Sequence, residues 1–349
     1  MICEGYFIRN SLSFKIRRKH FKMKKFIKEL KDKVLDGYEV TREDIDRLLE
    51  ISVENKEDFE TLLKSANEIR EKFCGNYFNL CTILNAKSGH CSENCKYCAQ
   101  SIHYKTNADV YPLVNKEKAL EMAKEVRKDG AHRFSLVTSG RGLKGEEKDL
   151  LDLTEIYKYL KANTDIDLCA SHGICTKKAL QELKNAGVKT YHHNLESSRN
   201  FYGNICTTHT YQDRVDTIKN AHAVGLQVCS GGIFGLGESE KDRIDMAFDL
   251  RELKVHSVPI NILTPIAGTP LENIEGLDPD VIIKDIAIYR FILPKTYIRF
   301  AGGRIKLGEK AKLALQGGVN AVLTGNFLTT TGNTIESDKK MIKELGYVF

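Results

Sequence analysis

Short apolar runs alternate with amphipathic helical patterns along most of this 349-residue chain. Eight runs have the length and composition of buried strands, and each is followed by apolar residues at helical spacing. The expected strands are Asn79–Asn85, His132–Thr138, Ile166–Ala170, Thr190–Asn194, Leu226–Ile233, His256–Leu263, Tyr297–Ala301 and Ala321–Thr324. The expected helices cover residues 116–129, 147–162, 176–186, 211–224, 240–253, 279–292, 308–317 and 335–345. Eight such units are what a closed (β/α)8 barrel requires, so the sequence predicts an α/β fold of the TIM-barrel type.

A doubly wound open sheet is the alternative arrangement of alternating strands and helices. Its usual mark is a glycine-rich dinucleotide fingerprint between a strand and a helix. The nearest match in this chain, Gly235-x-Gly237, has no third glycine at the required offset. We therefore prefer the closed barrel.

Two segments precede the predicted barrel, which we assign to residues 77–349. Residues 1–22 form a basic arm that we expect to be disordered, although an acid-poor start could also imitate a transit peptide or lie upstream of a true start at Met23. Residues 23–76 carry apolar residues at helical spacing and are expected to form a helical cap.

Composition excludes several classes of protein. Residues 1–28 contain nine Lys and Arg residues and a single acidic residue, Glu4. The net charge of +6 therefore comes from this segment and gives no evidence of a nucleic-acid surface on the rest of the chain. No apolar run approaches the ~20 residues of a membrane helix. Ten cysteines without a secretory signal favour metal ligands in a reducing cytoplasm over disulfides.

Three of these cysteines, Cys91, Cys95 and Cys98, stand within eight residues just after the first expected strand. A loop with this spacing can direct three sulfurs at one centre, whereas iron–sulfur cubanes usually take four cysteines. Three ligands would leave one iron open, as catalytic metal sites are. The alternative is a zinc knuckle that adds His90 or His103. Zinc motifs, however, usually combine two ligands close in sequence with a second such pair farther along the chain.

Polar residues near the ends of later expected strands are further candidates, because barrel active sites gather there. His192, Asn194 and Glu196 alternate along the fourth strand and share one face. Three polar side chains inside a barrel indicate a polar ligand. A glycine-rich run, Gly231–Gly237, follows the fifth strand and could form either a turn or a nucleoside cradle.

Other strand residues have an ordinary structural reading as well as a functional one. They are Ser135 in the second strand, Cys169 in the third, Cys175 just after it, Cys229 in the fifth and Arg299 in the seventh. A buried cysteine often acts as a small apolar residue, and a buried arginine often forms a salt bridge. Two thiols six residues apart at a barrel loop raise the odds of metal binding.

The cysteine trio, with Tyr97 before its last member, resembles the cluster motif of the radical S-adenosylmethionine (SAM) superfamily. Further runs, in the same order, resemble the biotin synthase family across nearly all of residues 40–349. They are Gly89–Ser101, Tyr191–Glu196, Asn200–Asn204, Val228–Glu238, Val258–Asn261, Gly268–Leu271, Tyr297–Arg304 and Leu328–Thr330. The resemblance implies a barrel enzyme that inserts sulfur into dethiobiotin to form biotin, with SAM cleaved to methionine and a 5′-deoxyadenosyl radical.

The same resemblance implies roles for single residues. Cys91, Cys95 and Cys98 would hold a 4Fe–4S cluster. The positions that match SAM-binding residues are Tyr97, Asn194, Glu196, Arg214 and Ile233. The positions that match dethiobiotin-binding residues are His192 and Asn261 for the ureido ring, and Thr329 and Thr330 for the carboxylate tail. Some members of the family have Asn at the position of His192.

A second cluster in this family, commonly 2Fe–2S, is held by three strand cysteines and an arginine, and donates the sulfur. Cys169, Cys229 and Arg299 match three of those positions, but Ser135 stands at the fourth. A serine alkoxide is a poor substitute for a thiolate. We therefore expect an auxiliary cluster, 2Fe–2S or larger, rebuilt on Cys169, Cys175 and Cys229 with Arg299 nearby. The predicted catalytic groups are the trio, Cys169, Cys229 and Arg299, whereas Cys175 is expected only as a cluster ligand.

The resemblance also implies partners: an electron-donor protein of the flavodoxin or ferredoxin type, and a second copy in a homodimer. Two alternatives to biotin formation stay open at this stage. One is another radical SAM enzyme of related architecture, such as a methylornithine synthase or a hydrogenase-cofactor maturase, which the Ser135 departure keeps open. The other is a non-enzymatic iron–sulfur or zinc protein.

Overall fold

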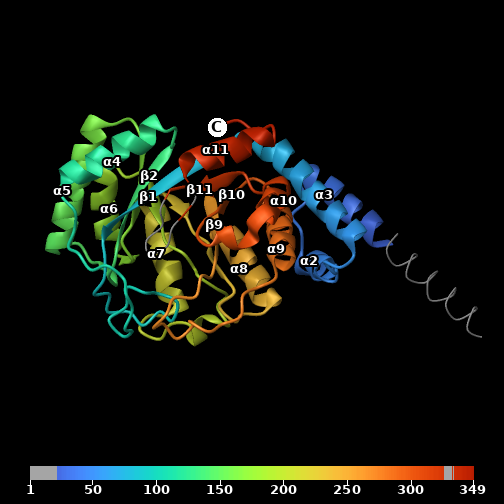
Figure 1. Ribbon diagram of the computed structural model, residues 1–349, viewed down its shortest axis with the longest axis horizontal. Helices are drawn as coiled ribbons and strands as arrows, with labels where there is room; N and C mark the ends of the chain where they lie inside the picture. Colours follow the sequence, from blue (N-terminus) through green and yellow to red (C-terminus); the bar gives the residue numbers. More distant parts are fainter. Residues whose placement is uncertain (1–21, 326–331, 333) are drawn as a thin grey trace, which may run out of the picture.

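Eight parallel strand positions close into a barrel (Figure 1). The computed structural model describes residues 22–325, 332 and 334–349. The strands are β1 (Asn79–Lys87), β2 (Arg133–Thr138), β4 (Asp167–Ser171), β6 (Thr190–His192), β7 (Gln227–Cys229) with β8 (Gly232–Phe234), β9 (Ser257–Ile262), β10 (Tyr297–Phe300) and β11 (Ala321–Leu323). Neighbours pair in the order β10-β11-β1-β2-β4-β6-β7-β9, and the β9–β10 pairing closes the ring. The predicted barrel is confirmed.

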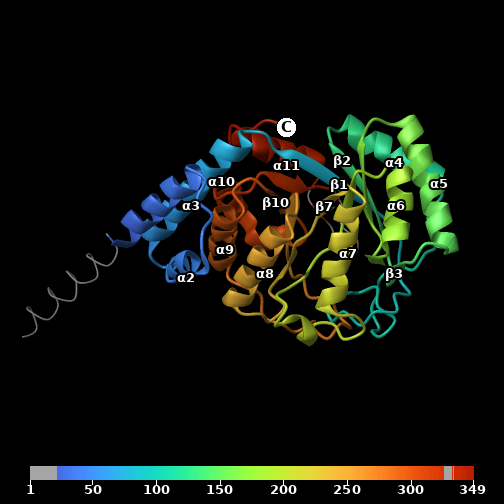
Figure 2. The ribbon, with the colours of Figure 1, turned by 180° about the vertical axis from the view of Figure 1, so that it is seen from behind.

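Helices follow the strands and cover the outside of the barrel (Figure 2). They are α4 (Lys116–Lys128), α5 (Lys148–Asn163), α6 (Lys177–Asn185), α7 (Tyr211–Ala223), α8 (Glu240–Glu252), α9 (Pro279–Ile292), η2 (Arg304–Lys310) with α10 (Ala311–Gln316), and α11 (Ile335–Glu344). Short polar side chains set several starts. Thr210 and Ser239, for example, form capping boxes that satisfy free N–H groups at α7 and α8.

Three helices lie outside the ring at one end of the molecule (Figure 1). They are a helix over residues 22–35, α2 (Arg42–Leu49) and α3 (Lys56–Cys74). Helix α3 packs on α9, and Ile282–Ile292 of α9 are all buried. A helix covered by the barrel on one side and by another helix on the other needs apolar residues on more than one face. The division of the chain at residue 76 stays a prediction.

The fifth strand differs from the prediction, because it is interrupted at Ser230 and Gly231. A Cβ on Gly231 would lie 2.0 Å from the carbonyl oxygen of Pro259, and one on Gly232 would lie 2.5 Å from that of Glu196. These two glycines therefore make room for neighbouring backbone, and the nucleoside interpretation of the rest of the run stays a prediction. A second, small sheet of β3 (Gly142–Leu143) and β5 (Ile174–Cys175) was not predicted.

Candidate active site

A cavity of about 350 Å³ lies inside the barrel. Because alternate side chains of each barrel strand point inward, residues far apart in sequence share its wall. The predicted site residues that line it are Tyr97, Cys98, Ser135, Cys169, His192, Asn194, Glu196, Cys229, Ile233, Asn261 and Arg299. Thr329 and Thr330 lie outside the described residues. One cavity therefore collects most of the predicted site.

The loop that carries the cysteine trio folds back on itself through backbone hydrogen bonds. The Cys91 N–H donates to the Gln100 carbonyl at 3.0 Å, and the Ile102 N–H donates to the Cys91 carbonyl at 2.9 Å. A third bond, of 3.0 Å, joins the Cys98 N–H to the Cys95 carbonyl. The trio thus sits on a wrapped loop and not on the continuous helix that the same spacing allows.

Thiols of the trio help to raise the pKa values of Cys95 and Cys98, although the three do not lie in direct contact as one group. Burial raises the pKa of the Cys98 thiol to about 11, with a further contribution from Cys91. The hydrogen bond to Cys206 is the main cause that raises the pKa of Cys95, burial raises it further, and Cys98 adds a smaller effect. Among the described residues, however, the trio is not a group of donors close enough together for a single ion. Separated but interacting sulfurs fit a polynuclear cluster and not the zinc knuckle.

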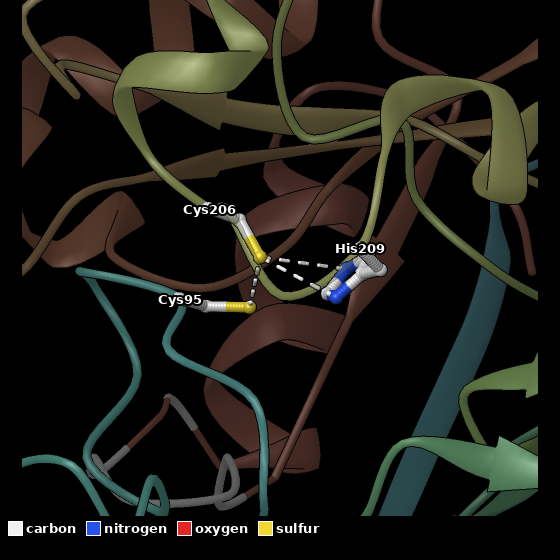
Figure 3. A group of neighbouring side chains, drawn as sticks. All are labelled: Cys95, Cys206 and His209. Carbon is white, nitrogen blue, oxygen red and sulfur yellow. Dashed lines mark hydrogen bonds between the residues drawn. The ribbon is translucent and has the colours of Figure 1, made fainter.

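A further group of donors beside this loop was missed by sequence reasoning (Figure 3). The Sγ of Cys206, just after the short helix η1 (Tyr202–Asn204), lies 3.7 Å from the Sγ of Cys95. The Nδ1 of His209 lies 3.4 Å from the Cys206 Sγ. In the part of the chain that the structure describes, these three side chains form the one group close enough to share an ion. A Cys-x-x-His spacing was the only signal in the sequence.

The polar residues that follow β6 form a connected unit. The Asn194 side chain donates to Glu196 Oε2 at 3.2 Å and accepts from the Gly231 N–H at 3.0 Å. Glu196 adopts a left-handed backbone with φ of 71°, uncommon outside glycine and frequent at functional sites. Its carboxylate points into the cavity together with Asn194 and His192. The predicted shared face is therefore present.

Arg214 reaches this unit from α7 and does not line the cavity. Its Nη1 donates to the Asn194 carbonyl at 2.8 Å and lies 3.7 Å from Glu196 Oε1. Its Nε donates to the Tyr202 hydroxyl at 2.5 Å. Burial lowers the pKa of Arg214, but Tyr97, Tyr202 and Glu196 raise it further than burial lowers it. Arg214 therefore supplies a fixed positive charge behind Asn194 and Glu196.

Asn261 is held by the backbone on both ends of its side-chain amide. Its Oδ1 accepts from the Gly302 N–H at 2.9 Å, and its Nδ2 donates to the Gly232 carbonyl at 3.2 Å. The amide keeps a second N–H and a second oxygen lone pair. Its orientation is thus fixed while one donor and one acceptor stay available for a ligand in the cavity.

Three thiols, from β1, β4 and β7, line the inner part of the same cavity: Cys81, Cys169 and Cys229. Cys81 was not predicted. A hydrogen bond from Cys169 is the main cause that lowers the pKa of Cys81, to about 6, and Arg299 and Arg133 lower it further against the effect of burial. The same contact raises the pKa of Cys169. Cys81 is therefore the more acidic thiol of the pair, favoured by the charges of buried Arg299 and half-buried Arg133.

Arg299 stands among these thiols without a carboxylate partner in the described residues. Its Nη1 donates to the carbonyls of Val322, at 2.9 Å, and Asn79, at 3.2 Å. Its Nη2 donates to the Asn79 side chain at 2.7 Å. A salt bridge within the barrel, the ordinary reading of this arginine, is not what the structure contains among those residues. A buried cation of this kind suits an anionic group in the cavity.

Models of known families match two parts of this chain. Residues 85–250 match the Radical SAM superfamily, and residues 259–348 match the Biotin and Thiamin Synthesis associated domain. Biotin synthase of Fusobacterium nucleatum is 65% identical over 327 residues, which cover 93% of this chain and 91% of that protein. Biotin synthase of Campylobacter hominis is 56% identical over 93% of this chain and 98% of its own length.

The chain belongs to the biotin synthase family. It is accordingly a radical SAM enzyme, and this family implies a 4Fe–4S cluster and SAM as cofactors. Among solved structures, a methylornithine synthase is similar with a TM-score of 0.78 at 22% identity, covering 91% of this chain and 96% of that one. The FeFe-hydrogenase maturase of Carboxydothermus hydrogenoformans has a TM-score of 0.77 at 20% identity, covering 98% and 81%. Both likenesses concern the fold alone. No helix in the described part of the chain is long and apolar enough to cross a membrane.

One prediction for this member of the biotin synthase family needs correction. Cys175 does not line the cavity but lies on β5, in the small outer sheet. Its sulfur receives a hydrogen bond from the Tyr191 hydroxyl at 3.1 Å, and Tyr191 points away from the inward-facing His192. Six residues of separation suggested proximity to Cys169, but the turn after β4 carries Cys175 outward. Cys175 is therefore withdrawn from the expected ligands.

Proposed function

We propose that this chain inserts sulfur into dethiobiotin to form biotin, at the cavity inside the barrel. The observation that carries the proposal is that a cysteine loop and three strand thiols open on one cavity with Asn261 on its wall. The strands are parallel, so the loop after β1 lies at the mouth and Cys81, early in β1, lies deeper. A substrate between them would meet a radical source on one side and a sulfur source on the other.

At the mouth, Cys91, Cys95 and Cys98 would hold the 4Fe–4S cluster. Bound there, cluster and SAM supply the radical that breaks an unactivated C–H bond, which no side-chain acid or base could do at neutral pH. Asn194 and Glu196 would hydrogen-bond the ribose of SAM, and the Tyr97 backbone would bind its adenine, with Ile233 beside it. Arg214 would complement the SAM carboxylate through its charge.

Deeper in the barrel, we propose that Cys81, Cys169 and Cys229 hold the auxiliary iron–sulfur cluster with Arg299. Cys81 would supply the thiolate that Ser135 cannot. The Ser135 hydroxyl supports this site, because it is buried, faces the cavity and has no hydrogen-bond partner among the described residues. Such an orphan polar atom fits a group that occupies the cavity. Iron and sulfide counts with Mössbauer spectra would distinguish a 2Fe–2S cluster from a larger one.

His192 and Asn261 would bind the ureido ring of dethiobiotin between the two clusters. A ureido group offers N–H donors and a carbonyl acceptor, which the free donor and acceptor of Asn261 complement. Thr329 and Thr330 would receive the carboxylate tail. The largely apolar wall would keep water away from reactive intermediates.

We extend the proposal to the enzyme's surroundings. An electron-donor protein of the flavodoxin or ferredoxin type would reduce the first cluster, and two chains would form a homodimer. Ten cysteines, several of them placed as metal ligands, favour a reducing cytoplasm. We also keep residues 1–22 as a basic arm, 23–76 as a helical cap and 77–349 as the barrel.

Anaerobic turnover tests the function. Protein whose clusters are assembled with sulfur-34 sulfide should convert dethiobiotin to biotin that carries the heavy isotope, in the presence of SAM and a reductant. Formation of 5′-deoxyadenosine without biotin would contradict sulfur insertion and favour another radical SAM reaction. A colourless preparation that contains zinc and no iron would contradict both iron–sulfur clusters and with them the proposed reaction.

A further inference from the structure

The segment 205–209 is fastened directly to the cluster loop. The Lys96 N–H donates to the Ile205 carbonyl at 2.9 Å. The Oδ1 of Asn94 accepts from the backbone N–H groups of Thr207 and Thr208, at 3.0 and 3.2 Å. These contacts join two segments more than a hundred residues apart. The place of Cys206 next to Cys95 is therefore set by the backbone and not by a free rotamer.

Cys206 is buried against Cys95, and few groups can accept its thiol hydrogen. The Cys95 thiol donates to the Cys206 Sγ at 3.7 Å, and this direction would reverse once Cys95 gives up its proton to bind iron. Asn94 Oδ1 lies at 3.5 Å, but two backbone N–H groups already occupy its two lone pairs. The Thr208 hydroxyl, also at 3.5 Å, can donate to the Cys206 sulfur or accept from it, and it also donates to Asn94 Oδ1 at 3.3 Å.

His209 does not take that hydrogen through its nearer nitrogen. The Nδ1 lies 2.5 Å from Glu93 Oε2, and an ionised carboxylate only accepts, so Nδ1 carries a proton and donates. Nε2 lies 3.8 Å from the Cys206 sulfur, farther than Cys95 does. Both His209 and Glu93 are buried, so the pair is fixed. A Cys95 bound to iron would have no proton, so its sulfur would be an acceptor in direct contact with the Cys206 thiol.

We propose that Cys206 is a positioning residue that donates its thiol hydrogen to the Cys95 sulfur and thereby raises the reduction potential of the 4Fe–4S cluster. A thiolate bound to iron has no proton, so Cys95 can only accept. Hydrogen bonds to ligand sulfurs withdraw electron density and help to set the potential of such clusters. His209 and Glu93 hold Cys206 in place. The inference rests on the proposed cluster site at Cys91, Cys95 and Cys98.

An EPR-monitored redox titration of the anaerobic, cluster-loaded enzyme tests the inference. Cys206→Ala should make one-electron reduction of the cluster about tenfold less favourable, which is about 59 mV toward more negative potential. Cys206→Ser keeps a hydrogen-bond donor, so its reduction potential should lie close to that of the wild type. Cys175→Ala, which removes a buried thiol remote from the loop, should leave the potential unchanged.

The sign of the shift separates the possible results. An unchanged potential in Cys206→Ala would overturn the proposal, and so would a shift to more positive potential, which would mean that Cys206 acts as an anion. Cys206→Val, which fills the volume of the thiol, repeats the test if the alanine variant does not load iron. Failure of the wild-type protein to load a 4Fe–4S cluster would instead reject the cluster site itself.

Discussion

The two cysteine sites of this enzyme are built in opposite ways. At the mouth of the barrel, Cys91, Cys95 and Cys98 stand within eight residues on one wrapped loop. Deeper inside, Cys81, Cys169 and Cys229 come from three strands that span about 150 residues of chain. The loop makes its site almost alone, whereas the inner site exists only once the barrel has closed.

This difference matters for what each site tolerates. In the loop, spacing fixes the ligands, so a lost thiol has no substitute nearby. In the barrel, any inward position at the right depth can supply a ligand. Ser135 pairs in register with Cys169 on the neighbouring strand, and Cys81 on β1 contacts the same Cys169 from another side. We therefore expect that a thiol moved from β1 to β2 would still face the same group of ligands.

The largest expected effect concerns the loop. Cys98→Ala should remove the 4Fe–4S cluster and reduce SAM cleavage by more than about 10³-fold, the scale of losing a group on which the chemistry depends. Iron content and 5′-deoxyadenosine yield measure this directly. Cleavage that persists at a tenth of the wild-type rate would show that the loop is not the cluster site.

The inner site should behave differently when its newly found ligand is removed. Cys81→Ala should lower biotin yield by more than the 10–100-fold typical of losing an outer-shell partner, because a ligand itself is lost. SAM cleavage should continue, since the loop is untouched. Iron and sulfide should fall only by the amount of the auxiliary cluster.

A thiol exchange between strands sharpens this test. In Cys81→Ser combined with Ser135→Cys, the thiol moves from β1 to β2 and still faces the cavity, so the double variant should recover a large part of the biotin yield that Cys81→Ser alone loses. The matched control is Cys175→Ala, which should keep both clusters and full turnover. Loss of the auxiliary cluster in that control would restore Cys175 as a ligand.

The same contrast explains what the sequence could and could not predict. Strand and helix periods identified every element of the barrel ring, and helix α9 has the predicted bounds. The loop motif was legible because its ligands are neighbours. His192, Asn194 and Glu196 do line one cavity, as alternation predicted, although β6 ends at His192 and the last two lie in the segment after it.

The missed residues are those whose role depends on contacts between segments. Cys81 sits in a buried strand with Leu80, Ile83 and Leu84, where a lone cysteine ordinarily packs as a small apolar side chain. Cys206 meets Cys95 only because a loop after η1 is tied across the cluster loop. Cys175 was wrongly predicted as a ligand because it is close to Cys169 in sequence. The turn after β4 separates the two side chains in space. Register between strands is set by the closed barrel, which local patterns do not encode.

Arg299 offers a smaller effect within the inner site. Arg299→Met keeps the length of the side chain but removes its charge and its bonds to Asn79 and Val322. Three thiols should still hold the auxiliary cluster, so we expect biotin yield to fall by about 10-fold, at the lower end for a supporting residue. Faster loss of auxiliary iron on exposure to a chelator is the direct measurement. An unchanged rate of iron loss would mean that the arginine serves only the barrel's packing.

The smallest effect concerns His192, which lies on the wall that both sites share. Burial lowers the pKa of His192 below its usual value of 6.5, against the opposing effect of Glu196, so the ring is neutral at pH 7. A neutral ring can donate one hydrogen bond and accept another, whereas the protonated ring only donates and adds a charge to a buried cavity. Biotin formation should therefore fall only at a pH below the usual histidine value of about 6.5, because the lowered pKa delays protonation.

His192→Asn removes the titrating group and keeps one donor and one acceptor. Its turnover at pH 7 should stay within about 10-fold of wild type, because the number of hydrogen bonds is preserved. The decisive measurement is the ratio of variant to wild-type biotin formation between pH 7.5 and 5.5, with SAM cleavage followed in the same samples. The ratio should rise toward acid pH, since only the wild type loses its acceptor. A constant ratio would show that another group causes the loss of activity at acid pH. Substrate binding would then not depend on a neutral His192 ring.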